Sequence, residues 1–213
     1  LSRTTITYAI DKTTSDKDSV LIYANKTGDA RGYDLLWKDN NITGNWPEES
    51  IVAYKDGVAY IDSGTHDGYV GNRDLFAIDA LTGEIISRYS IGSGYASPVI
   101  DGNTLYVGSG DESWDIDTPW TNPYGVFSFD ISNIRTQGLV LNWFYADDTG
   151  KVPEAVLIDT NHVYYAQFEG THLVALNRTD GSLAWTFSKA NYSSNFNLLL
   201  GGKTDLTRYG YIL

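Results

Sequence analysis

The sequence contains no cysteine and no methionine. The lack of cysteine excludes disulfides, thiolate metal sites and cysteine nucleophiles together. No apolar run approaches the roughly 18 residues of a transmembrane helix, so insertion into a membrane is not expected. No segment keeps a 3.6-residue hydrophobic period over ten residues, which predicts few helices. The polar first 20 residues carry no secretory signal and no initiating methionine, which is typical of a processed chain or an excised fragment.

Basic residues are scarce: 15 Lys and Arg stand against 27 Asp and Glu, for a net charge of −12. This field repels phosphate backbones and anionic membranes, so nucleic acid is excluded as a partner. Tyrosine (16), tryptophan (6), asparagine and threonine are plentiful, which favours an extracellular, cell-surface or periplasmic β-protein. Four N-x-[ST] sequons point gently the same way, as sites of N-glycosylation: Asn25, Asn41, Asn177 and Asn191.

An internal repeat dominates the sequence. Residues 75–87 and 173–185 align without a gap, through a small residue, an Asp or Asn two positions later, and a glycine four positions after that. A third copy at 126–130 has a longer turn before 141–144, and a weaker fourth copy lies at 8–11. The matched residues are Ala77, Asp79 and Gly83 in the first copy, Asp130 in the third, and Ala175, Asn177 and Gly181 in the second.

Each clear copy follows a strand–turn–strand pattern. Asp56-Gly57 and Asp101-Gly102 separate β-rich runs, and this pair is a strong hairpin signal because glycine accepts positive φ without steric cost. Four antiparallel strands recurring every 47–51 residues describe a propeller blade. We therefore expect an all-β protein, a β-propeller of about four four-stranded antiparallel blades, forming a small ring or part of a larger one. The blades are expected at 48–93, 94–150 and 151–192, with the termini 1–23 and 193–213 sharing one more and 24–47 as an irregular insertion.

The run Ala175-x-Asn177-x-x-x-Gly181-x-x-x-Trp185 resembles the tryptophan-docking motif of the quinoprotein (PQQ-like) propeller family. The resemblance covers residues 48–190 and implies that the tryptophan stacks between adjacent blades while Asp or Asn holds the turn. In the first copy Ser87 stands in place of the tryptophan. Many dehydrogenases of this family carry a vicinal cysteine pair beside the quinone, and this sequence has none. The resemblance thus implies the architecture more strongly than the reaction.

The acidic, aromatic loop 111–124 is the sharpest candidate for a site. Its carboxylates are hard oxygen ligands for Ca²⁺, although the order is not that of an EF-hand, and a solvated loop explains them equally well. Its aromatic side chains suit a sugar ring or a peptide, or else fold the loop onto its own blade. Calcium is the one cofactor this loop suggests. The predicted calcium ligands are Asp111, Glu112, Asp115 and Asp117, and the predicted ligand-binding aromatics are Trp114, Trp120 and Tyr124.

Other chemistry finds little support. His66, His162 and His172 have neither HxH nor HxxxH spacing, which argues against zinc. The sequence has no G-x-S-x-G, no Walker A and no dinucleotide fingerprint. No catalytic residue is predicted.

Two functions remain open, with a third as a variant. The first is a binding, scaffold or surface-assembly module without catalysis of its own, with a protein or carbohydrate partner. The alternative is a fragment of a PQQ-dependent dehydrogenase, an oxidoreductase. Self-assembly into a homo-oligomer through the terminal strands is the variant.

Overall fold

The computed structural model describes residues 7–11, 34–39, 52–62, 74–92, 97–109, 124–147, 156–166 and 172–188. These residues form three four-stranded antiparallel sheets and one two-stranded sheet. The first blade holds β3 (Ala53–Lys55), β4 (Val58–Asp62), β5 (Asp74–Asp79) and β6 (Ile85–Ser90); the second holds β7 (Val99–Asp101), β8 (Thr104–Ser109), β9 (Gly125–Asp130) and β10 (Val140–Ala146); the third holds β11 (Val156–Ile158), β12 (His162–Ala166), β13 (His172–Asn177) and β14 (Leu183–Ser188).

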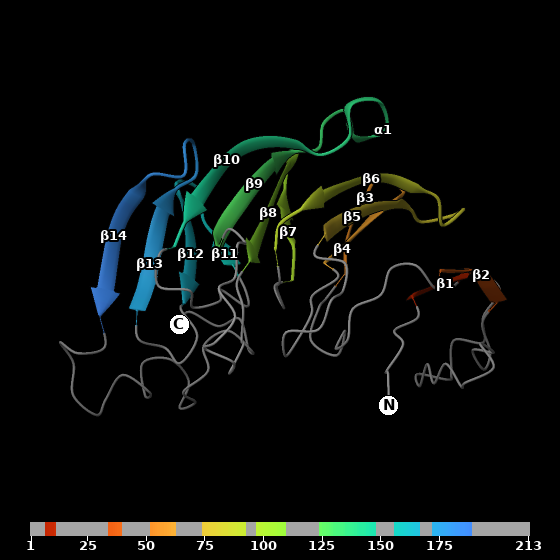
Figure 1. Cartoon of the computed structure of the whole chain (residues 1–213), viewed down its shortest axis with the longest axis horizontal. Coiled ribbons are helices and arrows are strands. Elements are labelled where there is room, and N and C mark those ends of the chain that lie inside the picture. Colours follow the sequence, from red (N-terminus) through yellow and green to blue (C-terminus); the bar gives the residue numbers. More distant parts are fainter. Residues whose placement is uncertain are drawn as a thin grey trace.

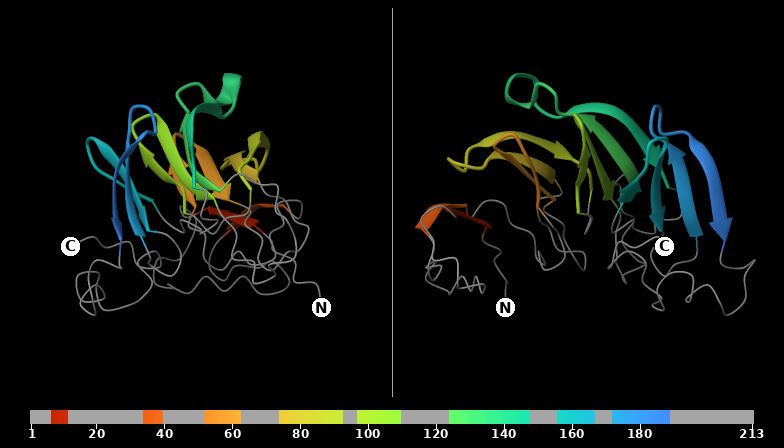
Figure 2. Two further views of the ribbon diagram at one scale, coloured as in Figure 1. Left: turned by 60° about the vertical axis from the view of Figure 1, so that its left-hand side comes forward. Right: turned by 180° about the vertical axis from the view of Figure 1, so that it is seen from behind.

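Every blade is a simple up-and-down meander in which strands pair in chain order. The three blades follow one another along an arc, and the views from the side and from behind show the same open arrangement (Figures 1 and 2). Hairpins between first and second strands, and turns between third and fourth strands, lie on the outer side of the arc; in Figure 1 the β13–β14 turn and the connection with α1 are at the top, and the β5–β6 turn is at the right. We call this side the turn face. The prediction of an all-β propeller with four-stranded antiparallel blades is confirmed.

The hairpins form where the sequence places Asp-Gly. Asp56 and Gly57 adopt φ angles of 50° and 79°, and Gly102 adopts 56°, in the left-handed region that tight hairpin turns require. The strands on either side alternate apolar side chains, so that β4 points Val58 and Tyr60 to one face and its neighbours to the other. Both faces of β4 are buried, as expected for an inner strand of a stacked blade.

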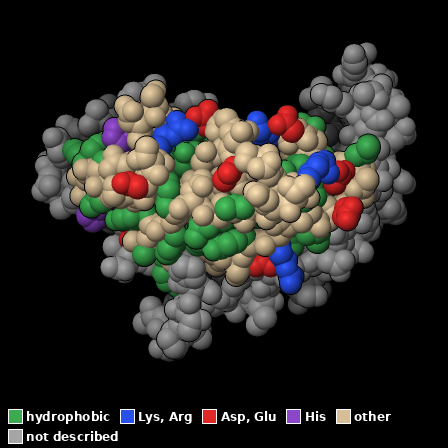
Figure 3. Space-filling view, turned by 90° about the horizontal axis from the view of Figure 1, so that it is seen from above, with side chains coloured by type: hydrophobic (Ala, Val, Ile, Leu, Met, Phe, Trp, Pro, Cys, Tyr) green, Lys and Arg blue, Asp and Glu red, His purple; other side chains and the backbone are tan. Residues whose placement is uncertain are grey.

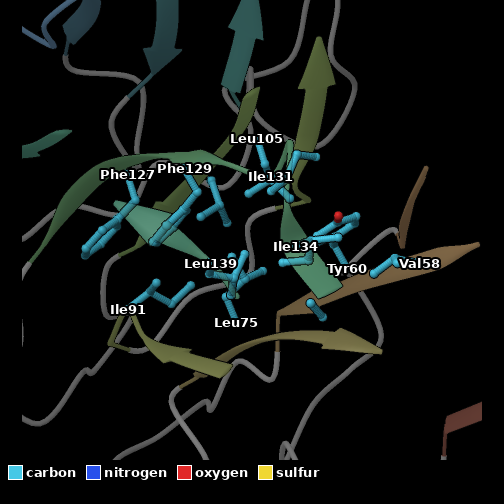
Figure 4. Close-up of a cluster of buried hydrophobic side chains, with 12 residues drawn as sticks. Val58, Tyr60, Leu75, Ile91, Leu105, Phe127, Phe129, Ile131, Ile134 and Leu139 are labelled. Carbon is cyan, nitrogen blue, oxygen red and sulfur yellow. The ribbon is translucent and has the colours of Figure 1, made fainter. Parts of the chain in front are cut away.

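Two apolar clusters hold the blades together. One lies between the first and second blades and includes Tyr60, Leu75, Phe127, Phe129 and Ile134 (Figure 4). The other lies between the second and third blades and is built on Tyr106, Trp143, Val163, Tyr165 and Leu176. Each fully buried side chain of this kind contributes about 1.5–3 kcal/mol. Packing between neighbouring blades therefore contributes to the stability of the fold.

The two-stranded sheet repeats the outer half of a blade. It pairs β1 (Thr7–Asp11) with β2 (Asp34–Asp39). Its register sets Ala9 opposite Trp37, with a bulge beside the pair, as Ala175 lies opposite Trp185 in the third blade. The sequence pattern treats residues 24–47 as an irregular insertion and leaves open whether they belong to a blade; β2 lies within this range and pairs with β1. The predicted strands of 193–213 lie outside the described residues.

Helix is almost absent from the described residues, as predicted. The single helix there is α1 (Ile134–Gln137), one turn inserted between β9 and β10. Nothing in the described part of the chain is a helix long and apolar enough to span a bilayer.

Candidate functional site

The turns of the turn face are built by their own side chains. Asp79 accepts hydrogen bonds from the backbone N–H groups of Leu81 and Thr82, both at 2.9 Å, and Gly83 donates to the Asp79 carbonyl at 2.8 Å. In the third blade Gly181 donates to the Asn177 carbonyl at the same 2.8 Å. The N–H of Thr82 foremost, and then the guanidinium of Arg135, lower the pKa of Asp79 to about 2. The turn therefore carries a fixed negative charge.

Trp143 of β10 joins the second blade to the third. Its indole N–H donates to the carbonyl of Arg178 at 3.0 Å, and its ring covers Gly181. A Cβ at Gly181 would lie 2.5 Å from a ring carbon, so only glycine allows this approach. The side chain is 8% exposed. At the other end of the same junction, the Tyr165 hydroxyl donates to Asp147 at 2.7 Å, both side chains being buried.

Trp185, which the repeat predicts to stack between blades, is 42% exposed. Its ring lies 5.8 Å from that of Tyr164 in its own blade. The tryptophan that does stack between described blades is Trp143. The ungapped repeat missed it because α1 lengthens the turn: Trp143 lies 13 positions after Asp130, whereas Trp185 lies 8 after Asn177.

The junction between the first and second blades uses a serine in the same place. Ser87 lies opposite Ala77, as Trp185 lies opposite Ala175, and its hydroxyl accepts a hydrogen bond from the Leu139 N–H at 3.0 Å. A Cβ at Gly138 would lie 2.7 Å from that hydroxyl, which leaves no room for a larger side chain without a shift. The apolar cluster that includes Ile134 of α1 fills this junction instead.

Two arginines that the sequence did not single out reach across the junctions. Arg178 donates to the Asp101 carboxylate at 2.5 Å, to the Tyr106 hydroxyl at 3.2 Å and to the Asp159 carbonyl at 2.6 Å. Arg135 of α1 pairs with Asp79 at 2.7 Å and reaches a first-blade hairpin carbonyl at 3.5 Å. In both cases the later blade reaches back to the earlier one. Seen from above, the turn face shows acidic and basic side chains lying next to each other (Figure 3).

A groove of about 290 Å³ opens on the turn face between the first two blades. Its walls come from the first-blade hairpin, the second-blade hairpin and the connection that holds α1. We call it the Tyr60 groove. The lining residues are Lys55, Asp56, Tyr60, Asn103, Ile131, Ser132, Asn133, Ile134, Arg135 and Thr136.

Tyr60 is the chemically distinctive member of this groove. It is 1% exposed overall and lines the groove. Burial, and then the nearby charge of Asp56, raise the pKa of Tyr60 to about 12. The hydroxyl therefore stays protonated at physiological pH and can donate a hydrogen bond to whatever enters the groove.

The loop that the sequence predicts as a site falls largely outside the described residues. Only Tyr124 is described there: it is partly buried, and its carbonyl accepts from the Asp147 N–H at 2.8 Å. The calcium ligands and two aromatics predicted there stay predictions. The undescribed predicted residues are Asp111, Glu112, Trp114, Asp115, Asp117 and Trp120.

Only some of the sequon asparagines and histidines lie among the described residues. The Asn177 side-chain nitrogen, which a glycan would use, donates to Ser182 at 2.9 Å. His162 lies 3.6 Å from Asp159 and 3.3 Å from the Tyr164 hydroxyl, and His172 begins β13. Among the described residues no three potential ligands gather to hold a metal ion. Asn25, Asn41, Asn191 and His66 lie outside the described residues.

Comparison with known proteins supports the fold. No family model and no curated protein matches the sequence. Among solved structures, a europium-containing methanol dehydrogenase is 13% identical with a TM-score of 0.55, over 86% of this chain and 38% of that one. A quinohemoprotein alcohol dehydrogenase from Comamonas testosteroni is 12% identical with a TM-score of 0.50, over 77% and 31%. BamB from Moraxella catarrhalis is 23% identical with a TM-score of 0.48, over 74% and 41%.

Together, the meandering blades and the likeness to the two dehydrogenase structures define the class of protein: a β-propeller, open in the part described. The chain spans about two fifths or less of each solved structure named above. At these identities the likeness concerns the fold alone.

Proposed function

We propose that this chain is a non-catalytic binding module that works outside the cytoplasm, and that the Tyr60 groove receives a polar segment of a partner protein. One observation carries the proposal: Tyr60 lines a groove between two blades, and burial raises its pKa to about 12, so its hydroxyl stays a hydrogen-bond donor. A hydrogen bond from this hydroxyl to a ligand contributes up to about 1.5 kcal/mol.

The charges around the groove favour a neutral ligand. Lys55 pairs with Asp56 at 3.4 Å, and Arg135 pairs with Asp79 at 2.7 Å. With these charges balanced, the groups left to meet a ligand are the amides, the hydroxyls and the phenol. Such a mixture of donors and acceptors matches the backbone of a peptide.

Acid–base catalysis fits this groove poorly. A general base must lose its proton near the working pH, and the pKa of Tyr60, raised to about 12 by burial, keeps it a donor. A sugar is also a weaker match here, because the Tyr60 ring is 1% exposed and offers no free face for stacking. Binding of a polypeptide is therefore the function that the groove supports best.

The location of the proposed module rests on composition. A net charge of −12 and abundant tyrosine and tryptophan accompany the four sequons. Calcium in the loop 111–117 belongs to the same proposal as a stabiliser of that loop, and its test is a calcium-dependent rise in melting temperature that Asp115→Asn removes.

A displayed library of random peptides tests the proposed function directly. Peptides selected on the intact chain should lose about threefold to tenfold in affinity on Tyr60→Phe, which removes only the hydroxyl. Thr136→Arg, which obstructs the groove at an exposed position, should weaken the same peptides. The matched control is Thr179→Arg, at an exposed position on the third-blade turn, which should leave binding unchanged.

The opposing outcomes are equally clear. If selected peptides bind Tyr60→Phe and Thr136→Arg as well as the original chain, or if selection yields none, the groove is not a peptide site. A stoichiometric bound quinone with turnover of alcohols would instead favour the dehydrogenase alternative.

A further inference from the structure

The third blade carries, on a face that no other described blade covers, the same three kinds of side chain that hold the Arg178 turn on the second blade. In both blades an aspartate lies at the end of the first strand, and a tyrosine and a tryptophan lie opposite the same small residue of the third strand. We call these groups docking sets. The second-blade docking set is Asp101, Tyr106 and Trp143, and the third-blade docking set is Asp159, Tyr164 and Trp185.

The second-blade docking set shows what such a group does. Asp101 and the Tyr106 hydroxyl accept hydrogen bonds from the guanidinium of Arg178, which also lies 5.5 Å from the centre of the Tyr106 ring. Trp143 packs on Gly181, three positions after that arginine. One turn, Asn-Arg-x-x-Gly, thus fills the whole set.

The third-blade docking set has nearly the same geometry before any partner arrives. The Tyr164 and Trp185 rings are 5.8 Å apart at 50°, against 5.9 Å at 46° for Tyr106 and Trp143. Tyr164 donates to Asp159 at 2.7 Å, which leaves the lone pairs of its oxygen available to a donor. This hydrogen bond foremost lowers the pKa of Asp159 to about 2, so the carboxylate is charged.

Exposure distinguishes the two sets. Trp185 is 42% exposed, whereas Trp143 is 8% exposed. We propose that the third-blade docking set binds an arginine presented on an Asp/Asn-Arg-x-x-Gly turn of a further propeller blade. The guanidinium would pair with Asp159 and Tyr164 while the glycine lies against Trp185.

A second copy of this chain is a poorer occupant. The backbone N–H of Ala80, Ile131 and Arg178 each donates to the hairpin of its own blade at 2.9 Å, so these are equivalent positions in the three turns. Only the third of these described turns carries arginine, and that arginine is already held by the second blade. The described turns of another copy therefore offer Ala80 or Ile131 where the guanidinium is needed.

A cyclised peptide with the sequence of residues 172–188 provides the probe. It presents the turn as a hairpin, and Trp185→Phe within the probe keeps its fluorescence silent. A matched probe replaces the arginine by citrulline, which has the same shape without the charge. Titrated onto the intact chain, the arginine probe should shift the Trp185 indole N–H signal in NMR spectra and leave that of Trp143 unmoved.

The expected result is saturable binding that citrulline weakens by at least about tenfold. Asp159→Asn and Tyr164→Phe in the chain should each weaken the arginine probe, and neither should change the citrulline probe. Equal binding of the two probes, no binding, or equal shifts at Trp143 would overturn the proposal. Reversible dimers in sedimentation equilibrium that Asp159→Asn abolishes would overturn the choice of occupant in favour of a second copy.

Discussion

The two blade junctions solve one packing problem in different ways. Between the second and third blades, Trp143 lies on Gly181 and a partly buried arginine crosses the gap. Between the first and second blades, Ser87 occupies the tryptophan position, and the inserted helix α1 with its apolar neighbours fills the space. Both junctions contain an apolar cluster, but only the second–third junction has a large ring at this position.

This difference predicts how strongly substitutions at each junction lower the stability of the fold. Loss of the Trp143 ring leaves a large hole, whereas loss of the small Ser87 side chain at the equivalent position leaves little space to fill. The second–third junction should therefore respond sharply to single substitutions. The first–second junction should respond weakly at the equivalent positions.

The largest expected effect is that of Trp143→Ala, which should lower the free energy of unfolding by about 3–5 kcal/mol. It removes a buried ring and leaves the Arg178 carbonyl without its donor. Trp185→Ala is the matched control and should cost about 1 kcal/mol or less, since that ring is 42% exposed. Denaturant unfolding measures both, and similar losses would remove the distinction between the two tryptophans.

Adding one methyl group should separate backbone strain from blade contact. Gly181→Ala and Gly102→Ala both place alanine at positive φ, 71° and 56°, which costs about 1–2 kcal/mol. At Gly102 nothing lies within 4 Å of the new Cβ, whereas at Gly181 it would lie 2.5 Å from the Trp143 ring. Gly181→Ala should therefore cost about 2 kcal/mol more in thermal or chemical unfolding. Equal costs would show that the ring moves aside freely.

Replacing the arginine at the second–third junction should also cost more stability than replacing the arginine at the first–second junction. Arg178→Met should cost about 1.5–3 kcal/mol, because its side chain is 18% exposed and bonds a carboxylate, a hydroxyl and a carbonyl. Arg135→Met should cost about 1 kcal/mol or less, since that side chain is 51% exposed and solvent screens its pair. Unfolding measured at low and at high salt checks this, because the Arg135 contribution should fall more with salt.

Ser87→Ala should have a smaller effect, about 1 kcal/mol, because the N–H of the buried Leu139 loses its acceptor. Thr186→Ala, at an exposed position on β14, is the control and should change stability by about 0.5 kcal/mol or less. A loss as large as that of Trp143→Ala would mean that Ser87 holds its junction alone.

The smallest effect should appear on acidification. The folded state holds the pKa of Asp79 at about 2, below its ordinary value, so the aspartate stabilises the fold above about pH 4. That contribution is lost as the pH falls toward 2. Asp79→Asn should therefore be less stable than the original chain by about 1 kcal/mol or less at pH 7, and equally stable near pH 2. A gap that persists at pH 2 would show that charge is not its cause.

Much of the architecture could be predicted because it is encoded locally. Asp-Gly hairpins, alternating apolar residues and a regular Asp/Asn-to-Gly turn depend on neighbours in the chain, so their spacing indicates the blade. The tryptophan position was harder, since α1 shifts Trp143 away from the ungapped pattern. The strand around Trp37 was missed because its partner lies across a long insertion.

The candidate sites were less predictable for a physical reason. Arg135, Arg178 and Tyr60 are ordinary residues in the sequence and gain their roles only when two blades meet. Their partners lie on other strands, at 78 and 77 positions for the arginines, where no local period reaches them. A search for basic residues just after the repeated Asp or Asn would have found Arg178.

Both arginines reach back toward the preceding blade, while Trp143 offers its ring forward to the next. A newly synthesised blade can therefore pack at once on the side chains of the blade before it, and its own side chains are then in place for the blade that follows. Growth in the order of translation, one blade at a time, buries apolar surface at each step without waiting for a distant strand. The direction of the side chains thus gives the stack a polarity that matches the direction in which a ribosome makes it.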